Sequence, residues 1–499
     1  MAEHFISRED AEHDLLASAA YLAEAIGSSD GRAQAMTAVV PRYLEKGEVD
    51  LAAELANTVD DPFVRDRLLV AVAETCASAD DEGYALQLID ALEDPGMQAQ
   101  ARERIGLRLA EQGKLDKAAS VADAMEHRDN VVAGVAVRQH RDGDTDAALE
   151  TASRIGFPAA AAHVYVAMAA ESIEKGNPEQ AADLLERALT PSEEIEHEEE
   201  RIRSLIDIGN SFAAAERGDR AIETFEAARG YADVLDNVHR DNFLAQVSMG
   251  FMNAGSVELA DRALDAVADK TQIATALLGF ARSMWKRGEK AEAVEALDEA
   301  YAVLKSQHER ETRDTKAKMA LFVNIAVQYA GFEKGERALE IAHELIDDEY
   351  ATNVLSQTAR IMSIQKNDEL TRQAVTSIAD DGQRALTLIS LSDTAFAEGE
   401  AAKGNEFLNE AFALAEEVPQ LASRSSAYNL IASRYLNLGE TELARASARE
   451  SLATIVEIKD DSSAAAALAG LSQVYEAGNF QMEDEERDSF LQLIVKATV

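Results

Sequence analysis

An internal repeat dominates this 499-residue sequence. Four of its copies are AEQGKLDKAASVADAM (110–125), IEKGNPEQAADLLERAL (173–189), WKRGEKAEAVEALDEAY (285–301) and LNLGETELARASARESL (436–452). Each has a glycine, then mostly polar residues, and an alanine five positions after the glycine. Glycine relieves the turn between two helices, and the small alanine lets the second helix pack closely on the first. The pattern therefore predicts a series of helical hairpins.

A second amphipathic stretch precedes each turn, as in IAVQYA (325–330) and IASRYL (431–436). Small and aromatic residues recur there at helical spacing, which predicts the first helix of each hairpin. Alignment of the units places thirteen turns about 36 residues apart. The predicted turn positions are Gly47, Asp80, Gly113, Gly143, Gly176, Glu216, Gly255, Gly288, Glu333, Asn367, Gly399, Gly439 and Gly478.

The pattern resembles the tetratricopeptide repeat (TPR) family, whose units are helix-turn-helix hairpins, and the resemblance covers nearly the whole chain. The best match is NIAVQYAGFEKGERALEIAHEL (324–345), with Ala326, Tyr329, Ala338 and Ala342 at the family's small and aromatic positions. The family's tryptophan is absent from most units. The resemblance implies an all-α, right-handed solenoid of about thirteen hairpins whose first helices line an inner, concave surface.

The expected domain organisation is a single repeat array with a helix capping each end. We predict an N-terminal cap over residues 1–29, the array over 30–481 and a C-terminal cap over 482–499. Ser7-x-x-Asp10 fits a capping box that opens a helix reaching about residue 26. Pro62, Pro95, Pro158, Pro191 and Pro419 are predicted to lie between units, and Pro178 to begin a helix after Asn177. Only Pro41 is predicted to lie inside a helix, which it should kink or interrupt.

The chain is strongly acidic. It has 48 Lys and Arg against 92 Asp and Glu, a net charge of −44 that repels nucleic acid and anionic lipid, so we expect no direct nucleic acid binding. Only 15 of the basic residues are lysine. This composition resembles the cytosolic proteins of salt-in halophiles, where molar salt screens the carboxylates. An acidic protein that seeks basic partners is the alternative, but the charge is spread along the whole chain rather than gathered in a tail.

No segment of the sequence predicts a membrane span or a signal peptide. No apolar run approaches the ~18 residues of a spanning helix. The N-terminus, MAEHFISREDAEHDLL, is acidic and lacks the basic and apolar regions of a leader. We therefore expect no membrane insertion and a cytoplasmic location.

The sequence offers little for catalysis or metal binding. It has no G-x-x-x-x-G-K-[ST] and no H-E-x-x-H, and its nine histidines form no i, i+3 or i, i+4 pair, so we expect them on the surface or in the groove. Cys76, the single cysteine, is expected to be a buried core thiol. DGDTD (142–146) resembles the start of a calcium loop, but Ala147 and Ser153 occupy the glycine and glutamate positions. We expect no catalytic residues, no metal and no cofactor.

A candidate partner site follows from the implied inner surface. The positions thirteen, ten, six and three residues before each turn are expected to face this inner surface. The polar residues at these positions include His163 and a group from three consecutive units. That group is Arg203, Asn210, Asn242, Arg282 and the only tryptophan, Trp285. Arginine presents a forked donor to carboxylate, asparagine can pair with a peptide main chain, and tryptophan offers an apolar anchor.

These observations predict a non-catalytic scaffold or adaptor that binds a protein partner or peptide segment on its concave face. The prediction rests on analogy with the fold. A regulatory or sensory module with a small ligand in the groove, or a self-assembling array, is the alternative. An enzyme of unfamiliar type is the third.

Overall fold

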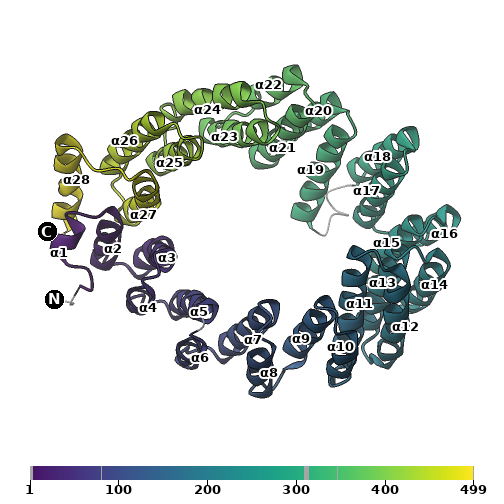
Figure 1. Cartoon of the computed structure of the whole chain (residues 1–499). Helices are drawn as coiled ribbons and strands as arrows, with labels where there is room; N and C mark the ends of the chain where they lie inside the picture. Colours follow the sequence, from purple (N-terminus) through teal and green to yellow (C-terminus); the bar gives the residue numbers. More distant parts are fainter. Residues whose placement is uncertain (1–3, 80, 308–313, 346, 498–499) are drawn as a thin grey trace. The chain divides into compact units, whose positions relative to one another are not determined.

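The computed structural model describes residues 4–79, 81–307, 314–345 and 347–497, and these residues form helices and no strand. The predicted all-α class is therefore confirmed. Successive helices pair as hairpins (Figure 1), and from α3 onward the odd-numbered helix of each pair comes first in the chain. The handedness and the number of hairpins stay predictions.

The chain forms two compact units, Met1–Arg102 with Leu355–Val499 (unit 1) and Glu103–Val354 (unit 2). The N-terminal helices of unit 1 are α1 (Arg8–Ala11), α2 (Leu15–Ala25), α3 (Ser29–Glu45), α4 (Val49–Asn57), α5 (Pro62–Ser78) and α6 (Glu82–Asp90). Its C-terminal helices are α22 (Asp368–Thr376), α23 (Asp381–Ala397), α24 (Ala401–Ala415), α25 (Leu421–Asn437), α26 (Thr441–Glu457), α27 (Asp461–Gly478) and α28 (Asp484–Ala497). The division into an N-terminal cap, a single repeat array and a C-terminal cap remains a prediction.

Unit 2 is one continuous stretch of chain. Its helices are α8 (Leu115–Asp123), α9 (Asp129–Arg141), α10 (Thr145–Ala152), α11 (Pro158–Glu174), α12 (Pro178–Glu194), α13 (Glu198–Ala214), α14 (Gly218–Val234), α15 (Arg240–Asn253), α16 (Val257–Leu264), α17 (Lys270–Lys286), α18 (Lys290–Lys305), α19 (Thr315–Gly331) and α20 (Gly335–Glu344). The unit boundaries fall within α7 (Pro95–Glu111) and α21 (Asp348–Ile364).

The hairpin turns lie where the repeat predicted them. Every predicted glycine turn except Gly478 has a positive φ, and Glu216 and Glu333 adopt the same left-handed conformation with φ of 59° and 61°. The alanine five positions later is fully buried in each of these units except the one that turns at Gly399, as Ala181 and Ala221 illustrate. The left-handed residue turns the chain, and the alanine brings the two helices of a hairpin together.

Three turns depart from the prediction or lie outside it. Lys366 (φ 60°) rather than Asn367 turns the chain, so the alanine position falls on buried Thr371. Near the C-terminus Asn479 (φ 48°) takes the place predicted for Gly478. Asp80 lies outside the described residues. In the unit that turns at Gly399, the alanine is replaced by Gly404, because a Cβ there would lie 2.8 Å from the Phe396 ring.

The helix boundaries correct two other predictions. Ser7 does cap a helix, since its Oγ accepts from the Asp10 N–H at 3.0 Å, but that helix stops at Ala11 and Asp14 caps a separate α2. Pro191 lies inside α12 rather than between units, as Pro41 lies inside α3. Both helices continue through their proline because packing on neighbouring helices outweighs one lost hydrogen bond.

First helices form a layer in unit 2. Along this layer α9 contacts α11, α11 contacts α13, α13 contacts α15 and α15 contacts α17, whereas successive second helices share fewer contacts. The layer of first helices is therefore the more closely packed side of unit 2, and the array curves toward it.

The two ends of the chain meet in unit 1. Helix α27 packs against both α2 and α3, and α28 also contacts α2 (Figure 1). Helices α2 and α3, near the N-terminus, thus pack on the end of the row that α25 and α27 form near the C-terminus.

Polar side chains hold the loops between hairpins. Asp66, Asp129 and Asp241 each accept two backbone N–H groups, 27 and 28 residues downstream, at 2.7–3.2 Å. At other junctions an arginine donates to the carbonyl oxygen of an apolar residue six positions earlier; these arginines are Arg32, Arg201, Arg384 and Arg424. Both devices satisfy backbone groups that a buried loop would otherwise leave unpaired.

Phe225 is a central packing residue of unit 2. It is fully buried on α14 and lies between Gly209 on α13 and Gly250 on α15, where a Cβ would approach its ring to 2.7 Å and 2.4 Å. Two first helices can therefore close around one aromatic ring only because both positions lack a side chain. In unit 1, Cys76 is 3% exposed, which confirms the predicted core thiol, and burial raises its pKa.

Candidate functional site

A groove of about 430 Å³ opens on the first-helix layer of unit 2. Three consecutive first helices, α7, α9 and α11, supply its lining. Its apolar residues are Leu107, Ala133, Gly134, Val137, Val164 and Ala167, and its polar residues are Glu103, Glu111, Asn130, Arg138, Arg141 and His163. The floor is apolar, and both arginines lie in the last turn of α9.

Both arginines of this groove are already paired. Arg138 Nε donates to both carboxylate oxygens of Asp142, at 2.9 Å and 3.0 Å, and its guanidinium also donates to the Glu111 carbonyl oxygen. Arg141 Nε donates to Glu171 at 3.0 Å, and this hydrogen bond lowers the pKa of the Glu171 carboxyl. The groove therefore offers an apolar floor between neutralised ion pairs rather than an open positive site.

The structure places three predicted site residues as ties between neighbouring first helices. From α13 the Arg203 guanidinium lies over the Phe243 ring on α15, 5.7 Å from its centroid, while Arg203 also pairs with Glu199. In α15 the Asn242 amide donates to Gln272 Oε1 on α17 at 3.1 Å.

The third tie continues along the same layer. Arg282 Nε on α17 donates to Gln328 Oε1 on α19 at 2.7 Å. Arg203 and Arg282 are both exposed, so each guanidinium is accessible while it spans to the next helix. Asn210 is exposed on α13, two turns beyond Arg203.

Trp285 has a different environment from the other four. Its indole stacks on the buried ring of Phe332, with centroids 4.2 Å apart and planes 11° apart, and the Lys290 ammonium lies 4.6 Å from the indole centroid. The side chain is half-buried at the end of α17, next to the turn of the following hairpin. Trp285 thus joins two hairpins, which narrows the surface it can offer to a partner.

Sequence reasoning missed Asp207, which lies one turn from Arg203 on α13. Asp207 is exposed, yet desolvation by the surrounding protein raises the pKa of its carboxyl, and the charge of His163 on α11 opposes that shift. Since His163 also lines the groove, Asp207 extends the polar surface from the groove toward Arg203. Its position, four residues after Arg203 on a first helix, was the available signal.

One histidine contradicts the expected surface location. His140 on α9 is 3% exposed; its Nε2 lies 2.8 Å from Ser172 Oγ on α11, and its Nδ1 lies 3.1 Å from Thr145 Oγ1 on α10. Burial lowers the pKa of His140, and nearby Lys175 lowers it further. Both ring nitrogens of His140 thus have hydroxyl partners where α9, α10 and α11 meet, as expected of a buried polar side chain.

The remaining motifs show no chemical site. GSSDG (27–31), which sequence reasoning missed, fits the G-x-S-x-G of serine hydrolases, but it joins α2 to α3 rather than a strand to a helix. Within the described residues no three His, Cys, Asp or Glu side chains are grouped to hold a metal ion. No helix in that part of the chain is long and apolar enough to cross a membrane.

Two observations identify the architecture. Left-handed turns are followed by a buried small residue, and the first helices of the hairpins pack in one layer. The chain is a TPR-like repeat array. Comparison with models of known protein families finds no match, and neither does comparison with curated proteins.

Solved structures similar to this TPR-like chain share little sequence with it. Ton1535 from Thermococcus onnurineus NA1 is 16% identical over 81% of this chain and 98% of its own, with a TM-score of 0.25. The apo form of RapI is 12% identical over 64% and 98% (TM-score 0.28), and the TPR-like repeats of a putative kinesin light chain from Podosopora anserina are 18% identical over 45% and 100% (TM-score 0.24). At these identities and TM-scores the likenesses carry no conclusion about what this chain binds.

Proposed function

We propose that this chain is a non-catalytic scaffold or adaptor that binds a protein partner or peptide segment on the first-helix layer of its TPR-like array. The groove between α7, α9 and α11 carries this proposal. Gly134 lets Leu107 of α7 pack closely on α9, the small side chain of Ala167 leaves room for a main chain, and the rim arginines are held in place by Asp142 and Glu171. A preformed apolar floor with a polar rim is the arrangement expected of a binding surface.

Polar residues farther along the layer, all exposed except the half-buried Asn242, extend the proposed surface. Arg203, Asn210, Asn242 and Arg282 lie on α13, α15 and α17. An extended segment that crosses these helices can place a carboxylate at Arg282 and main-chain groups at the asparagines. Trp285 contributes by fixing α17 against the next hairpin as well as by its remaining exposed surface.

The test is capture of a partner in molar KCl, followed by peptide mapping of the captured protein. Ala167→Glu places a charge in the groove and is expected to weaken capture at least tenfold. Ala182→Glu is the matched control, because Ala182 is a similarly half-buried alanine on the second helix α12. Arg282→Ala and Trp285→Ala are each expected to weaken binding by ~1–3 kcal/mol with helix content unchanged. Equal capture by the Ala167→Glu and Ala182→Glu variants would place the partner elsewhere.

A small ligand is the second candidate occupant, because about 430 Å³ falls within the usual range of ligand pockets. A metabolite that raises the melting temperature of the chain without any protein partner would favour a sensory module. The Ala167→Glu variant should lose that shift, and the Ala182→Glu variant should keep it.

A further inference from the structure

The contact between the two ends of the chain in unit 1 is an apolar interface. We name it the seam, formed by α2 and α3 on one side and α27 on the other. All residues of α2 except the last two are buried, among them Leu16, Tyr21 and Leu22. The facing helix α27 buries Leu468, Leu471 and several alanines. Small and branched side chains therefore meet in a largely apolar contact. A cavity of about 590 Å³ opens at one end of it, lined by Leu15 and Leu16 from α2 and by Ser472 and Tyr475 from α27.

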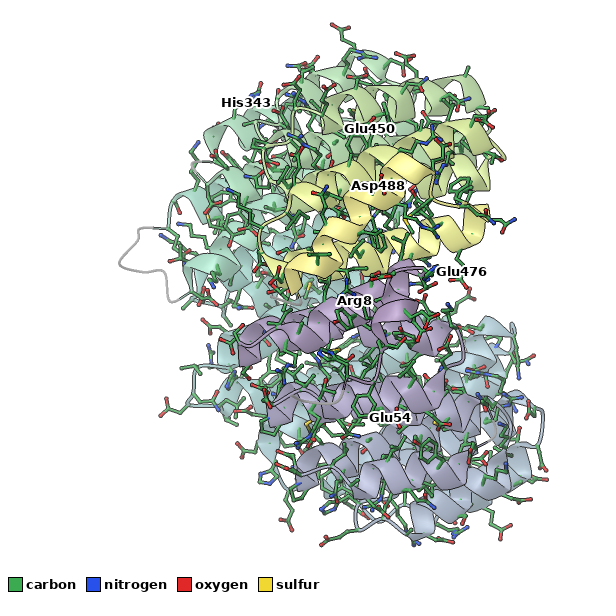
Figure 2. All side chains as sticks on the ribbon, turned by 90° about the vertical axis from the view of Figure 1, so that its left-hand side faces the viewer. Arg8, Glu54, His343, Glu450, Glu476 and Asp488 are labelled. Atoms are coloured by element: carbon green, nitrogen blue, oxygen red, sulfur yellow. The ribbon has the colours of Figure 1, made fainter. Side chains whose placement is uncertain are left out.

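Two polar contacts cross the seam. Arg42 Nη2 on α3 lies 3.3 Å from Glu476 Oε2 on α27, and Ser462 Oγ on α27 donates to Gln34 Oε1 on α3 at 3.2 Å. Figure 2 shows Glu476 where the C-terminal helices border the N-terminal ones. Arg42 is only 9% exposed and also pairs with Glu45, so its charge is fixed at the edge of the apolar contact.

Neither side of the seam has the polar outer face that terminal repeats require. A linear array exposes its first and last helices and covers them with polar caps. Here α2 is apolar on nearly every side, and the buried face of α27 is its cover. The two surfaces differ from each other, so the contact is heterologous, and every copy of the chain carries both of them.

We propose that the seam is an exchangeable interface and that a second copy of this chain can occupy either side of it. In the two-chain form, α2 and α3 of each copy pack on α27 of the other copy, so the apolar surfaces of both seams are buried. Within one chain the folded array holds the two ends together, so closure is intramolecular and the closed single chain dominates at micromolar protein. Conditions that weaken closure, or that concentrate the chain, favour exchange. This inference is independent of the proposed groove function.

Charge reversal across the seam tests the exchange directly. Arg42→Glu places two glutamates opposite each other within one chain, and Glu476→Arg places two arginines opposite each other. Either variant alone has a repulsive seam both within the chain and between identical chains. An equimolar mixture restores one Arg–Glu pair at each of two intermolecular seams. Light scattering on the mixture, at the lowest KCl concentration in which both variants stay folded, is expected to show a species of twice the chain mass, at least tenfold enriched over either variant alone.

Matched variants separate seam exchange from a general effect of charge. Arg42→Glu with Glu476→Arg in one chain restores the pair internally and is expected to give a single-chain mass. Arg434 and Asp393 form an exposed ion pair at 2.9 Å elsewhere in unit 1, so a mixture of the Arg434→Glu and Asp393→Arg variants should contain single chains only. A seam mixture in which no two-chain species forms would overturn the proposal.

A second measurement uses the unmodified sequence and does not depend on the folding of the variants. Two differently tagged wild-type chains are unfolded, mixed and refolded at about 5 µM and at about 500 µM, because pairing between chains rises with concentration whereas closure within one chain does not. Mixed-tag pairs are expected to rise at least tenfold in proportion at the higher concentration. An equal proportion of mixed pairs at both concentrations would overturn the proposal.

Discussion

Unit 1 and unit 2 use the same hairpin but are assembled differently. Unit 2 is one stretch of chain in which each hairpin packs on the next, as α11 packs on α12 and on α13. Unit 1 joins two stretches separated by the whole of unit 2, and the seam between α2, α3 and α27 is its long-range contact. One unit therefore accumulates stability from neighbours, while the other depends on residues more than 400 positions apart.

This difference determines how far a local change spreads. In an array of nearest-neighbour contacts a lost interaction loosens the hairpins beside it. Across the seam a change near the N-terminus is transmitted to helices near the C-terminus, because they complete the same packed layer. Closing so long a segment also delays formation of the contact during folding.

Salt removal is expected to have the largest effect and to act on both units. The chain carries a net charge of −44, and lowering KCl from molar to ~0.1 M lengthens the screening distance from ~3 Å to ~10 Å. Carboxylate repulsion should then loosen or unfold the array, as circular dichroism would record. A melting temperature that is the same in both salts would reject the halophilic interpretation. Unequal melting of the two units would show which mode of assembly is more sensitive to repulsion.

Truncation of the central ring of unit 2 is expected to have the next largest effect. Phe225→Ala leaves a cavity between Gly209 and Gly250 and should cost ~3–5 kcal/mol. Hydrogen exchange should accelerate in α13, α14 and α15, with less change in unit 1. Phe157, 52% exposed, is the control, and Phe157→Ala should stay within ~0.5 kcal/mol. Faster exchange throughout both units would show that unit 2 does not loosen locally.

The matched truncation in unit 1 is Leu16→Ala on α2. Leu16 is 1% exposed, so the loss should be ~2–5 kcal/mol. Because α2 packs on α27, exchange is expected to accelerate in α27 as well as in α2 and α3. Acceleration confined to the N-terminal helices would mean that the seam contributes little to the stability of α27, and the contrast between the units would disappear.

The local periodicity of the sequence was sufficient to predict the hairpins. Glycine with a positive φ and a buried alanine five positions later are properties of single units, so their spacing is visible in the chain. The errors arose where another contact decided the outcome. Lys366 displaced the predicted turn by one residue, and Pro191 was absorbed into α12.

Contacts between distant residues had no comparable signal. The seam is made by alanines and leucines that resemble those of every other helix, so the sequence does not distinguish α2 and α27 as partners. The long-range partners of Asp66, Asp129 and Asp241 are backbone N–H groups, which leave no complementary side chain to recognise in the sequence. The candidate site was located on first helices, but whether Arg203 or Asn242 is free or ties two helices depends on Phe243 and Gln272.

Acidification is expected to weaken unit 2 through His140. Burial lowers the pKa of the folded group below the ~6.5 of the unfolded one, so the unfolded chain takes up the proton first. The stability contributed by neutral His140 is therefore full above pH ~6.5 and is lost as the pH falls through the folded pKa. Urea unfolding at pH 7.5 and pH 5.5 should show a larger loss for the wild type than for His140→Gln. Equal losses would assign the acid sensitivity of unit 2 to other groups.

The smallest expected effect compares one turn from each unit. Glu216 in unit 2 and Lys366 in unit 1 hold left-handed φ values of 59° and 60°, which cost a residue with a Cβ more than they cost glycine. Glu216→Gly relieves the backbone but also increases the entropy of the unfolded chain, which opposes the gain. The net increase in the free energy of unfolding should be ~0.5–1 kcal/mol. Lys366 Nζ pairs with Glu400 at 3.0 Å across to the next hairpin, so Lys366→Gly removes a contact as it relieves the backbone. Urea unfolding in molar KCl, where that exposed pair is screened, should bring the two substitutions closer together. If Lys366→Gly remains less favourable in high salt, the difference between the turns lies in the packing of their units rather than in the ion pair.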